Sequence, residues 1–336
     1  MSGSDPDIKN VWQKLEHILR RGREPVPVMD ESASLWRQYS HDLCKDPLAM
    51  VGLAILVLLI SIAVLAPYIA PYDPDAIEIS RRLQWPNQDH LLGTDKFGRD
   101  VLSRIIFGAR LSLLMPAIIV VISLSIGTTV GLLSGFKGGL VDSLLMRVVD
   151  IKSSFPGLLL TLAIIGMLGP GLFNAVIAMS ISGWTGYARI IRGMTLSFRE
   201  MEFIEAAKCL GASDRYILIK HILPNVLSPV VLLATLNMAG AILSLAGLGF
   251  LGLGAQPPTA EWGSMLSDSQ GLIFSAPYLI FIPGIAIMIT VLAFNLLGDG
   301  LRDAIDSKSG GMATRCEGNA ILPNSTQILF SQANLF

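Results

Sequence analysis

The stretch Glu205-Ala206-Ala207-Lys208-Cys209-Leu210-Gly211, followed by His221-Ile222-Leu223-Pro224-Asn225, is a polar segment between two long apolar ones. Ala and Glu favour a helix and Gly suits the left-handed backbone that ends one, so the stretch predicts two short helices joined at Gly211. Pro224 is expected to stop the second helix, because proline disfavours the helical region for the residue before it. Such a helix–turn–helix can present a small-residue knob to another protein, and an ordinary solvated loop is the alternative.

The composition of the chain indicates a membrane protein. Of its 336 residues, 52% are hydrophobic and 15% are charged, whereas soluble domains carry about 25% charged residues. The net charge of −1 and the lack of a Lys/Arg-rich run give no sign of nucleic-acid binding. The cysteines Cys44, Cys209 and Cys316 are scattered, without the spacing of a disulfide framework or a zinc site.

Six apolar stretches are long enough to cross a bilayer core of about 30 Å. They cover residues 48–70, 111–135, 141–168, 172–188, 226–253 and 276–297. The third is expected to begin as an amphipathic helix outside the hydrocarbon, to kink near Pro156 and then to cross. The sequence therefore predicts an all-α integral membrane protein with six transmembrane helices and both termini on one side.

The membrane domain is expected over residues 47–306, between two polar parts. Residues 1–46 form an arm without a signal-peptide pattern, in which Trp36 and Tyr39 favour either an interfacial helix or a plain linker. Residues 307–336 form a Ser/Asn/Gly-rich tail that we expect to be disordered. The segments on the side of the N-terminus hold nineteen Lys and Arg residues and the opposite side holds six, so the positive-inside rule predicts cytoplasmic termini and a cytoplasmic loop at residues 199–225.

The chain lacks residue patterns that several other functions need. Apart from the amphipathic start of the third stretch, residues 141–152, the proposed spans contain no charged residue or His, which argues against a secondary transporter or a proton pump. A nucleotide-binding P-loop and a Gly-x-Ser-x-Gly motif are both missing, and the four His residues are far apart. We therefore expect no catalytic residue, no cofactor and no metal site in this chain.

The polar stretch also carries a family resemblance. Glu205-Ala206-Ala207, Gly211 and Leu223-Pro224 resemble the cytoplasmic "EAA" loop of permease subunits in binding-protein-dependent ABC importers. His221 stands where an aliphatic residue is usual, which is similar to the dipeptide, oligopeptide and nickel branch of these permeases. The stretches at 91–100, 247–258 and 297–303 resemble the same branch, so the resemblance covers residues 35–306.

The resemblance implies a type I ABC importer permease in the bacterial inner membrane. Its implied partners are a second permease, an extracytoplasmic solute-binding protein and two ATPase subunits that hold ATP and Mg. In the family the loop docks in a groove on the ATPase. Ala206 and Ala207 would then allow close approach, Glu205 would pair with a basic group or only cap its own helix, and a large residue in place of Ala207 would prevent docking.

Peptides are the expected cargo, with nickel or a metallophore complex as the alternative within the branch. An ATP-independent channel or secondary carrier, and an assembly subunit without a pathway, are alternatives from other classes. In the polar insertion at 72–110 we expect a structural motif on the periplasmic side, and a contact with the solute-binding protein is the alternative. Its residues are Gly93, Asp95, Gly98, Arg99, Asp100 and Arg104.

Overall fold

The structure is a computed structural model that describes residue 43 and residues 45–317. Within this part of the chain the regular elements are helices, and no β-strand occurs. The arm up to residue 42, together with residue 44, and the tail from residue 318 lie outside the described residues. The predictions about Trp36 and Tyr39 therefore stay predictions.

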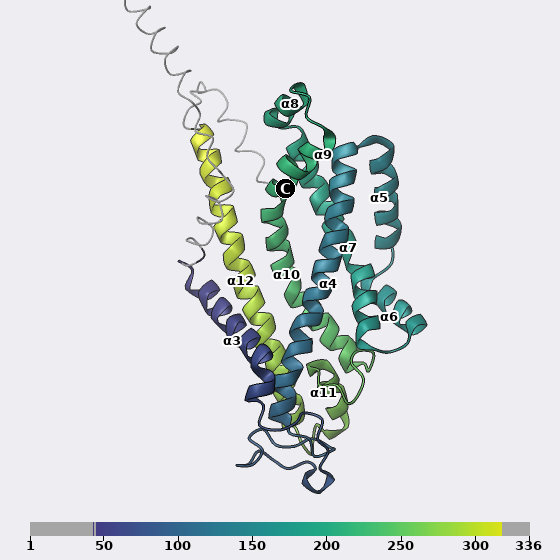
Figure 1. Cartoon of the computed structure of the whole chain (residues 1–336), viewed down its shortest axis with the longest axis vertical. Helices are drawn as coiled ribbons and strands as arrows, with labels where there is room; N and C mark the ends of the chain where they lie inside the picture. The colour runs from purple at the N-terminus through teal and green to yellow at the C-terminus, as the bar shows by residue number, and fades with distance from the viewer. Residues whose placement is uncertain (1–42, 44, 318–336) are drawn as a thin grey trace, which may run out of the picture. The chain divides into compact units, whose positions relative to one another are not determined.

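Long helices run along the bundle (Figure 1). They are α3 (Pro47–Ile69), α4 (Val101–Lys137), α7 (Leu172–Arg199), α10 (Leu223–Phe250) and α12 (Tyr278–Glu317). The shorter elements are η1 (Ile79–Arg81), α5 (Gly139–Ser153), α6 (Gly157–Leu168), α8 (Glu202–Cys209), α9 (Asp214–Tyr216), η2 (Ile217–Ile222), α11 (Trp262–Ser269) and η3 (Gln270–Leu272). Helices α8 and α9 lie at one end of the bundle and α11 at the other (Figure 1), and we call these the α8 end and the α11 end.

Four helices of the described part are long and apolar enough to cross a membrane: α3, α4, Pro229–Phe250 of α10 and Tyr278–Asp303 of α12. The pair α5 and α6, bent by 82° at the break before Gly157, raises the number to five if it is one span. The predicted kink near Pro156 is therefore confirmed. The predicted count of six spans is not confirmed by length and composition, since α7 is not among the helices that are long and apolar enough to cross a membrane.

Helix α7 nevertheless lies along the later part of α4 (Figure 1). At the α11 end the backbone N–H of Gly171 donates to the carbonyl of Leu253 at 3.2 Å. At the α8 end Arg199 donates to the carbonyl of Phe136 at 3.3 Å. The three Arg residues of α7 and its small polar residues lower its hydropathy.

Glycines on α4 let α7 approach closely. A Cβ at Gly127, Gly131 or Gly135 would lie 2.5, 2.7 or 2.7 Å from the nearest atom of α7. This i, i+4 spacing is the small-residue pattern that brings membrane helices together. On α10, Gly240 and Gly247 face open space, whereas a Cβ at Gly249 would lie 2.8 Å from the Glu261 carboxylate and 3.0 Å from the backbone of Gly263 in α11.

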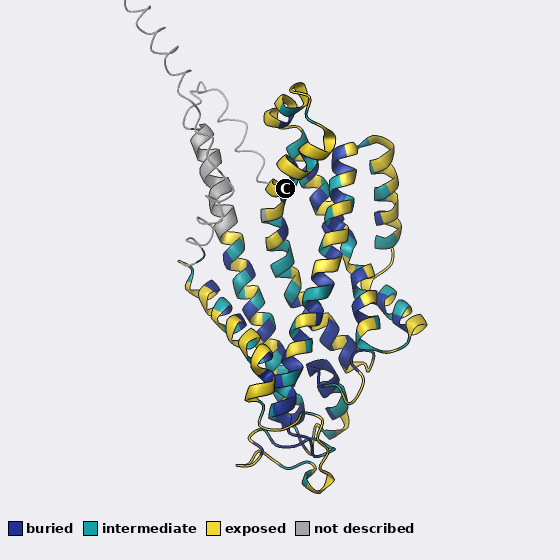
Figure 2. Ribbon diagram, viewed as in Figure 1, coloured by how far each residue is buried: buried dark blue, intermediate teal, exposed yellow. Residues whose placement is uncertain are grey.

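Two helices run past the predicted bounds of the membrane domain or its spans. Helix α4 begins at Val101, ten residues before the predicted span, because Asp100 caps it and accepts a hydrogen bond from the Ser103 N–H at 2.8 Å. Helix α12 continues past Asp306 to Glu317, so the first part of the expected disordered tail is helical. Large apolar side chains stay exposed along the outer helices (Figure 2), for example Leu58 at 60% and Val64 at 66%, as expected of surfaces that face lipid.

Candidate functional site

The loop between α7 and α10 forms the two short helices that its sequence predicts. Glu202 and Glu205 lie in the first turn of α8 and Lys208 lies in the last, where each charge complements the helix dipole. Gly211 follows α8 with a φ of +83°, a left-handed conformation that suits glycine. Ser213 then caps α9 by accepting the N–H of Tyr216.

Three fully buried isoleucines anchor this loop: Ile204 of α8 and Ile217 and Ile222 of η2 are 0% exposed. They belong to a cluster that includes Phe136 of α4 and Ile191 of α7. Because an eight-residue helix is marginal by itself, this tertiary contact is what holds α8 in place.

The outer surface of α8 is open to a partner. Glu205 and Ala206 are exposed, and Leu210 at its end is 88% exposed. Ala207 is half-buried and packs against the isoleucine cluster. Of the two alanines expected to allow close approach, Ala206 alone is fully on the open surface.

Pro224 does not stop the second helix, which corrects the prediction. Leu223 before it is helical, with φ −55° and ψ −46°, and α9, η2 and α10 run on as one continuous helical path. Pro224 lies in the first turn of α10, directly after the π-helical turn η2, where the wider ladder tolerates a residue without an N–H. His221 lies in that turn, with its ring centroid 5.4 Å from Tyr216 and 6.2 Å from Phe203.

A surface groove of about 540 Å³ lies beside α8. Its walls mix both signs of charge, contributed by Lys137, Arg199, Glu200, Glu205, Lys208 and Asp214. Ion pairs between α5 and α7 lie nearby: Arg192 donates two hydrogen bonds to the Asp142 carboxylate, each of 2.6 Å, and Arg189 donates to Asp150 at 3.0 Å. Charged pairs of this kind give the α8 end a defined polar surface.

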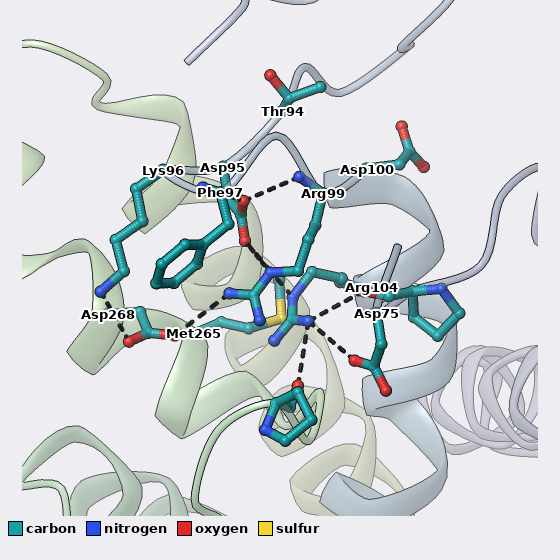
Figure 3. A network of polar contacts seen from close by, with 12 residues as sticks. Asp75, Thr94, Asp95, Lys96, Phe97, Arg99, Asp100, Arg104, Met265 and Asp268 are labelled. Atoms are coloured by element: carbon teal, nitrogen blue, oxygen red, sulfur yellow. Dashed lines mark hydrogen bonds and ion pairs between the residues drawn. The ribbon is translucent and has the colours of Figure 1, made fainter. Parts of the chain in front are cut away.

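At the α11 end, three residues of the expected structural motif contact one another (Figure 3): Asp95 pairs with both Arg99 and Arg104. The Asp95 carboxylate accepts from the N–H groups of Phe97 at 2.8 Å and Arg99 at 3.0 Å, and from Arg99 Nε at 2.6 Å. Gly93 and Gly98 shape the loop with φ of +77° and +76°. A Cβ at Gly98 would lie 1.9 Å from the carbonyl oxygen of Glu78.

Arg104 joins this loop to two other parts of the chain. It is 2% exposed and donates to the carbonyls of Pro74 at 3.0 Å and Pro258 at 3.2 Å. Its guanidinium also contacts Asp75 at 3.3 Å. Asp100, 3% exposed, caps α4 and shares a hydrogen bond of 2.9 Å with His90. All six predicted residues are thus used in internal contacts or in the backbone geometry of the loop.

Sequence reasoning missed the distant partners of this network and a buried acid. Asp268 of α11 bonds Lys96 at 3.0 Å across 172 positions of sequence. Glu261, 2% exposed, caps α11 and accepts from Gly263, Ser264 and the Ser112 hydroxyl at 2.9 to 3.0 Å. Burial raises the pKa of this carboxyl. Glu is not among the residues preferred at a helix N-cap, so neither the capping by Glu261 nor the partners of Asp268 leave a local signal in the sequence.

Comparison with known proteins identifies the family. The sequence profile of the binding-protein-dependent transport system inner membrane component matches residues 127–310, and that of the N-terminal transmembrane domain of oligopeptide transport permease C matches residues 34–87. The dipeptide transport system permease protein DppC of Alkalihalophilus pseudofirmus is 48% identical over 277 residues, which are 82% of this chain and 91% of that protein.

Two further similarities agree with this. The glutathione transport system permease protein GsiD of Pectobacterium atrosepticum is 42% identical over 274 residues, which are 81% of this chain and 91% of that protein. Among solved structures, an inward-facing conformation of the MetNI methionine ABC transporter superposes with a TM-score of 0.50 at 22% identity, over 60% of this chain and 97% of that one. At this identity the structural likeness concerns the fold alone.

Proposed function

Because the chain belongs to the family of binding-protein-dependent transport system inner membrane components and is the permease subunit of an ABC importer, we propose that it imports short peptides and is driven through its α8–α9 loop. It works with other permease and ATPase subunits in the inner membrane. Two relatives with the names dipeptide permease and glutathione permease support the cargo, since glutathione is itself a small peptide.

The observation that carries the coupling proposal is the way the loop is built. Its inner side is fixed to α4 and α7 by Ile204, Ile217 and Ile222, while its outer side presents Glu205 and Ala206. A force applied to α8 would reach the long helices through that buried contact. We propose that an ATPase subunit binds this outer surface, that ATP and Mg are held by the ATPase subunits, and that a solute-binding protein delivers the peptide at the α11 end.

We also propose an orientation of the bundle in the membrane. The α8 end and both termini lie in the cytoplasm, as the Lys and Arg distribution favours, and the α11 end with its network around Arg104 lies outside. Internal pairing of Asp95, Arg99 and Arg104 supports a bracing role for the network rather than direct contact with the binding protein.

Coupling is tested by Ala206→Trp in the complete complex. The indole would block close approach at an exposed position that does not touch the isoleucine cluster, so we expect loss of peptide uptake and of substrate-stimulated ATP hydrolysis with normal assembly of the permease pair. Ala54→Trp, the same change at an exposed position of α3 outside both ends, is the control and should retain both activities. Normal coupling in Ala206→Trp would contradict the proposal.

The cargo is tested separately by uptake in a strain that lacks this chain. Labelled dipeptide, labelled glutathione and nickel are offered to the strain with and without a plasmid copy of the gene. We expect the plasmid to restore peptide uptake and to leave nickel uptake unchanged. Restoration of nickel uptake alone would overturn the peptide assignment and leave the coupling proposal standing.

A further inference from the structure

A single arginine lies on the outward face of α4 without a partner. Arg110 is exposed, and within the described part of the chain it makes no hydrogen bond or ion pair. Arg104, six positions earlier on the same helix, is buried with several partners. Since α4 is apolar enough to span the membrane, Arg110 places a positive charge on the surface of the protein that faces the membrane. The network around Arg104 does not include this charge.

Two surface pockets meet at Arg110. The first, of about 400 Å³, lies between α3 and α4 and is also lined by Met238 of α10 and Phe294 of α12. Apart from Arg110 its lining is apolar, and it includes Leu56, Ile60 and Val64 of α3 and Ala117 of α4. The second, of about 380 Å³, has Asp75, Phe107 and Thr259 in its wall. We call the two together the Arg110 groove.

The chemistry of the Arg110 groove changes along α4. Phe107 lies in the wall shared with Asp75 and Thr259, Arg110 follows one turn later, and Ala117 lies about 10 Å further on at 1.5 Å per residue. The order from the α11 end toward the middle of the membrane is therefore polar wall, cation, apolar wall. On α3, Val64 is five residues from the end at Ile69, or about 7.5 Å, which puts the guanidinium within reach of the headgroup layer.

The geometry points to an anionic phospholipid as the occupant of the Arg110 groove. Its phosphate would accept hydrogen bonds from Arg110, since charge-assisted bonds to a guanidinium are the strong ones. One acyl chain would lie in the apolar pocket between α3 and α4. Val64 and Leu114 in this pocket are 66% and 54% exposed, as is expected of apolar side chains that contact acyl chains.

A peptide fits the same groove less well. Its terminal carboxylate could pair with Arg110, but a peptide in the apolar half of the groove would place its amide groups where the lining offers no polar side chain besides Arg110. Buried amides without hydrogen-bond partners are costly. The lipid site is therefore independent of the cargo and of the coupling loop.

Native mass spectrometry of the full-length chain in its complex tests this site, with phosphatidylglycerol titrated against phosphatidylcholine. We expect tighter binding of phosphatidylglycerol, and about a fivefold loss of that binding in Arg110→Ala with phosphatidylcholine unchanged. Arg110→Lys should retain most of the preference. Arg82→Ala, at an exposed arginine of the same end outside the groove, should change nothing.

A second variant tests the apolar half of the site. Ala117→Phe adds a ring to the half-exposed wall of the pocket, so we expect weaker binding of both lipids while Arg110 is intact. Unchanged phosphatidylglycerol binding in Arg110→Ala would overturn the proposal. A loss of dipeptide binding in that variant at constant lipid composition would also overturn it, because Arg110 would then bind the transported peptide.

Discussion

Replacement of Ile204 by alanine tests whether α8 is held by a single buried side chain. In α8, every residue of which the structure describes, Ile204 alone is buried, and it is 0% exposed. Ile→Ala in a core costs about 2–5 kcal/mol through lost transfer energy and the cavity left behind. An eight-residue helix cannot hold itself together in water, so this loss should open α8 locally while the bundle stays folded.

Hydrogen exchange of the complex in nanodiscs measures the effect. A loss of about 2 kcal/mol raises the open population of α8 roughly thirtyfold, so its amides should exchange that much faster while those of α4 and α7 keep their rates. Ile219→Ala removes the same atoms from a side chain that is 63% exposed in the same loop and is the control. ATPase coupling should fall in Ile204→Ala and persist in Ile219→Ala.

Two results would refute this reasoning. Unchanged exchange of α8 in Ile204→Ala would mean that other contacts hold the helix. Equal acceleration in α4 and α7 would mean that the loop is part of the cooperative core and is not a separately anchored element.

Three further predictions concern the rest of the fold. Gly98→Ala should lower the free energy of unfolding by at least about 2 kcal/mol, because the added Cβ would clash with Glu78. Gly139→Ala, at a glycine that also has a positive φ but faces open space, should lower it less. Thermal unfolding compares the two variants, and equal losses would contradict the clash. Asp142→Asn should lower the free energy of unfolding by about 1–3 kcal/mol, because it breaks the paired hydrogen bonds from Arg192. Asp150→Asn should lower it by under about 1 kcal/mol, because the side chains of Arg189 and Asp150 are 50% and 64% exposed. Equal shifts of the thermal midpoint in the two variants would contradict this ranking. Burial raises the pKa of Glu261 in the folded protein, so the protonated carboxyl stabilises the fold. This contribution is complete at pH values below the ordinary Glu pKa of about 4.3 and is lost as pH rises through the raised value. The thermal midpoint of the wild type relative to Glu261→Gln should therefore fall as pH rises from about 4 to 7, and a constant difference would refute it.

The parts of the site that depend on neighbours in sequence were predictable. The helix over Glu202–Cys209 and the turn at Gly211 follow from helix propensity and from the conformational freedom of glycine, and both are present. Apolar length alone located α3 and most of α4, α10 and α12. The bend before Gly157 followed from one proline.

Tertiary contacts overrode the local rules elsewhere. Pro224 was expected to end a helix, but the π-helical turn before it accommodates the ring. The apolar span was placed at residues 172–188, and helix α7 runs past it to Arg199, where Arg192 and Arg199 have partners on α5 and α4. No local pattern announces those partners.

Long-range pairing also hid the network at the α11 end. The charges at Asp95, Arg99 and Arg104 were visible, but their contacts with Asp268 and Pro258 lie far away in sequence. The sequence thus indicated charged residues in this loop and not their distant contacts. Likewise, Arg110 was assigned to a polar insertion because the start of α4 was placed ten residues late.

Crosslinking from Cys209 tests the central claim most directly. This cysteine is exposed at the end of α8, and a photoreactive group can be attached to it in the full complex after Cys44 and Cys316 are replaced by Ser. We predict that it captures an ATPase subunit, and that the same group on Ala76→Cys at the α11 end does not. Capture of the ATPase from residue 76, or none from Cys209 in a complex that still transports, would contradict the account.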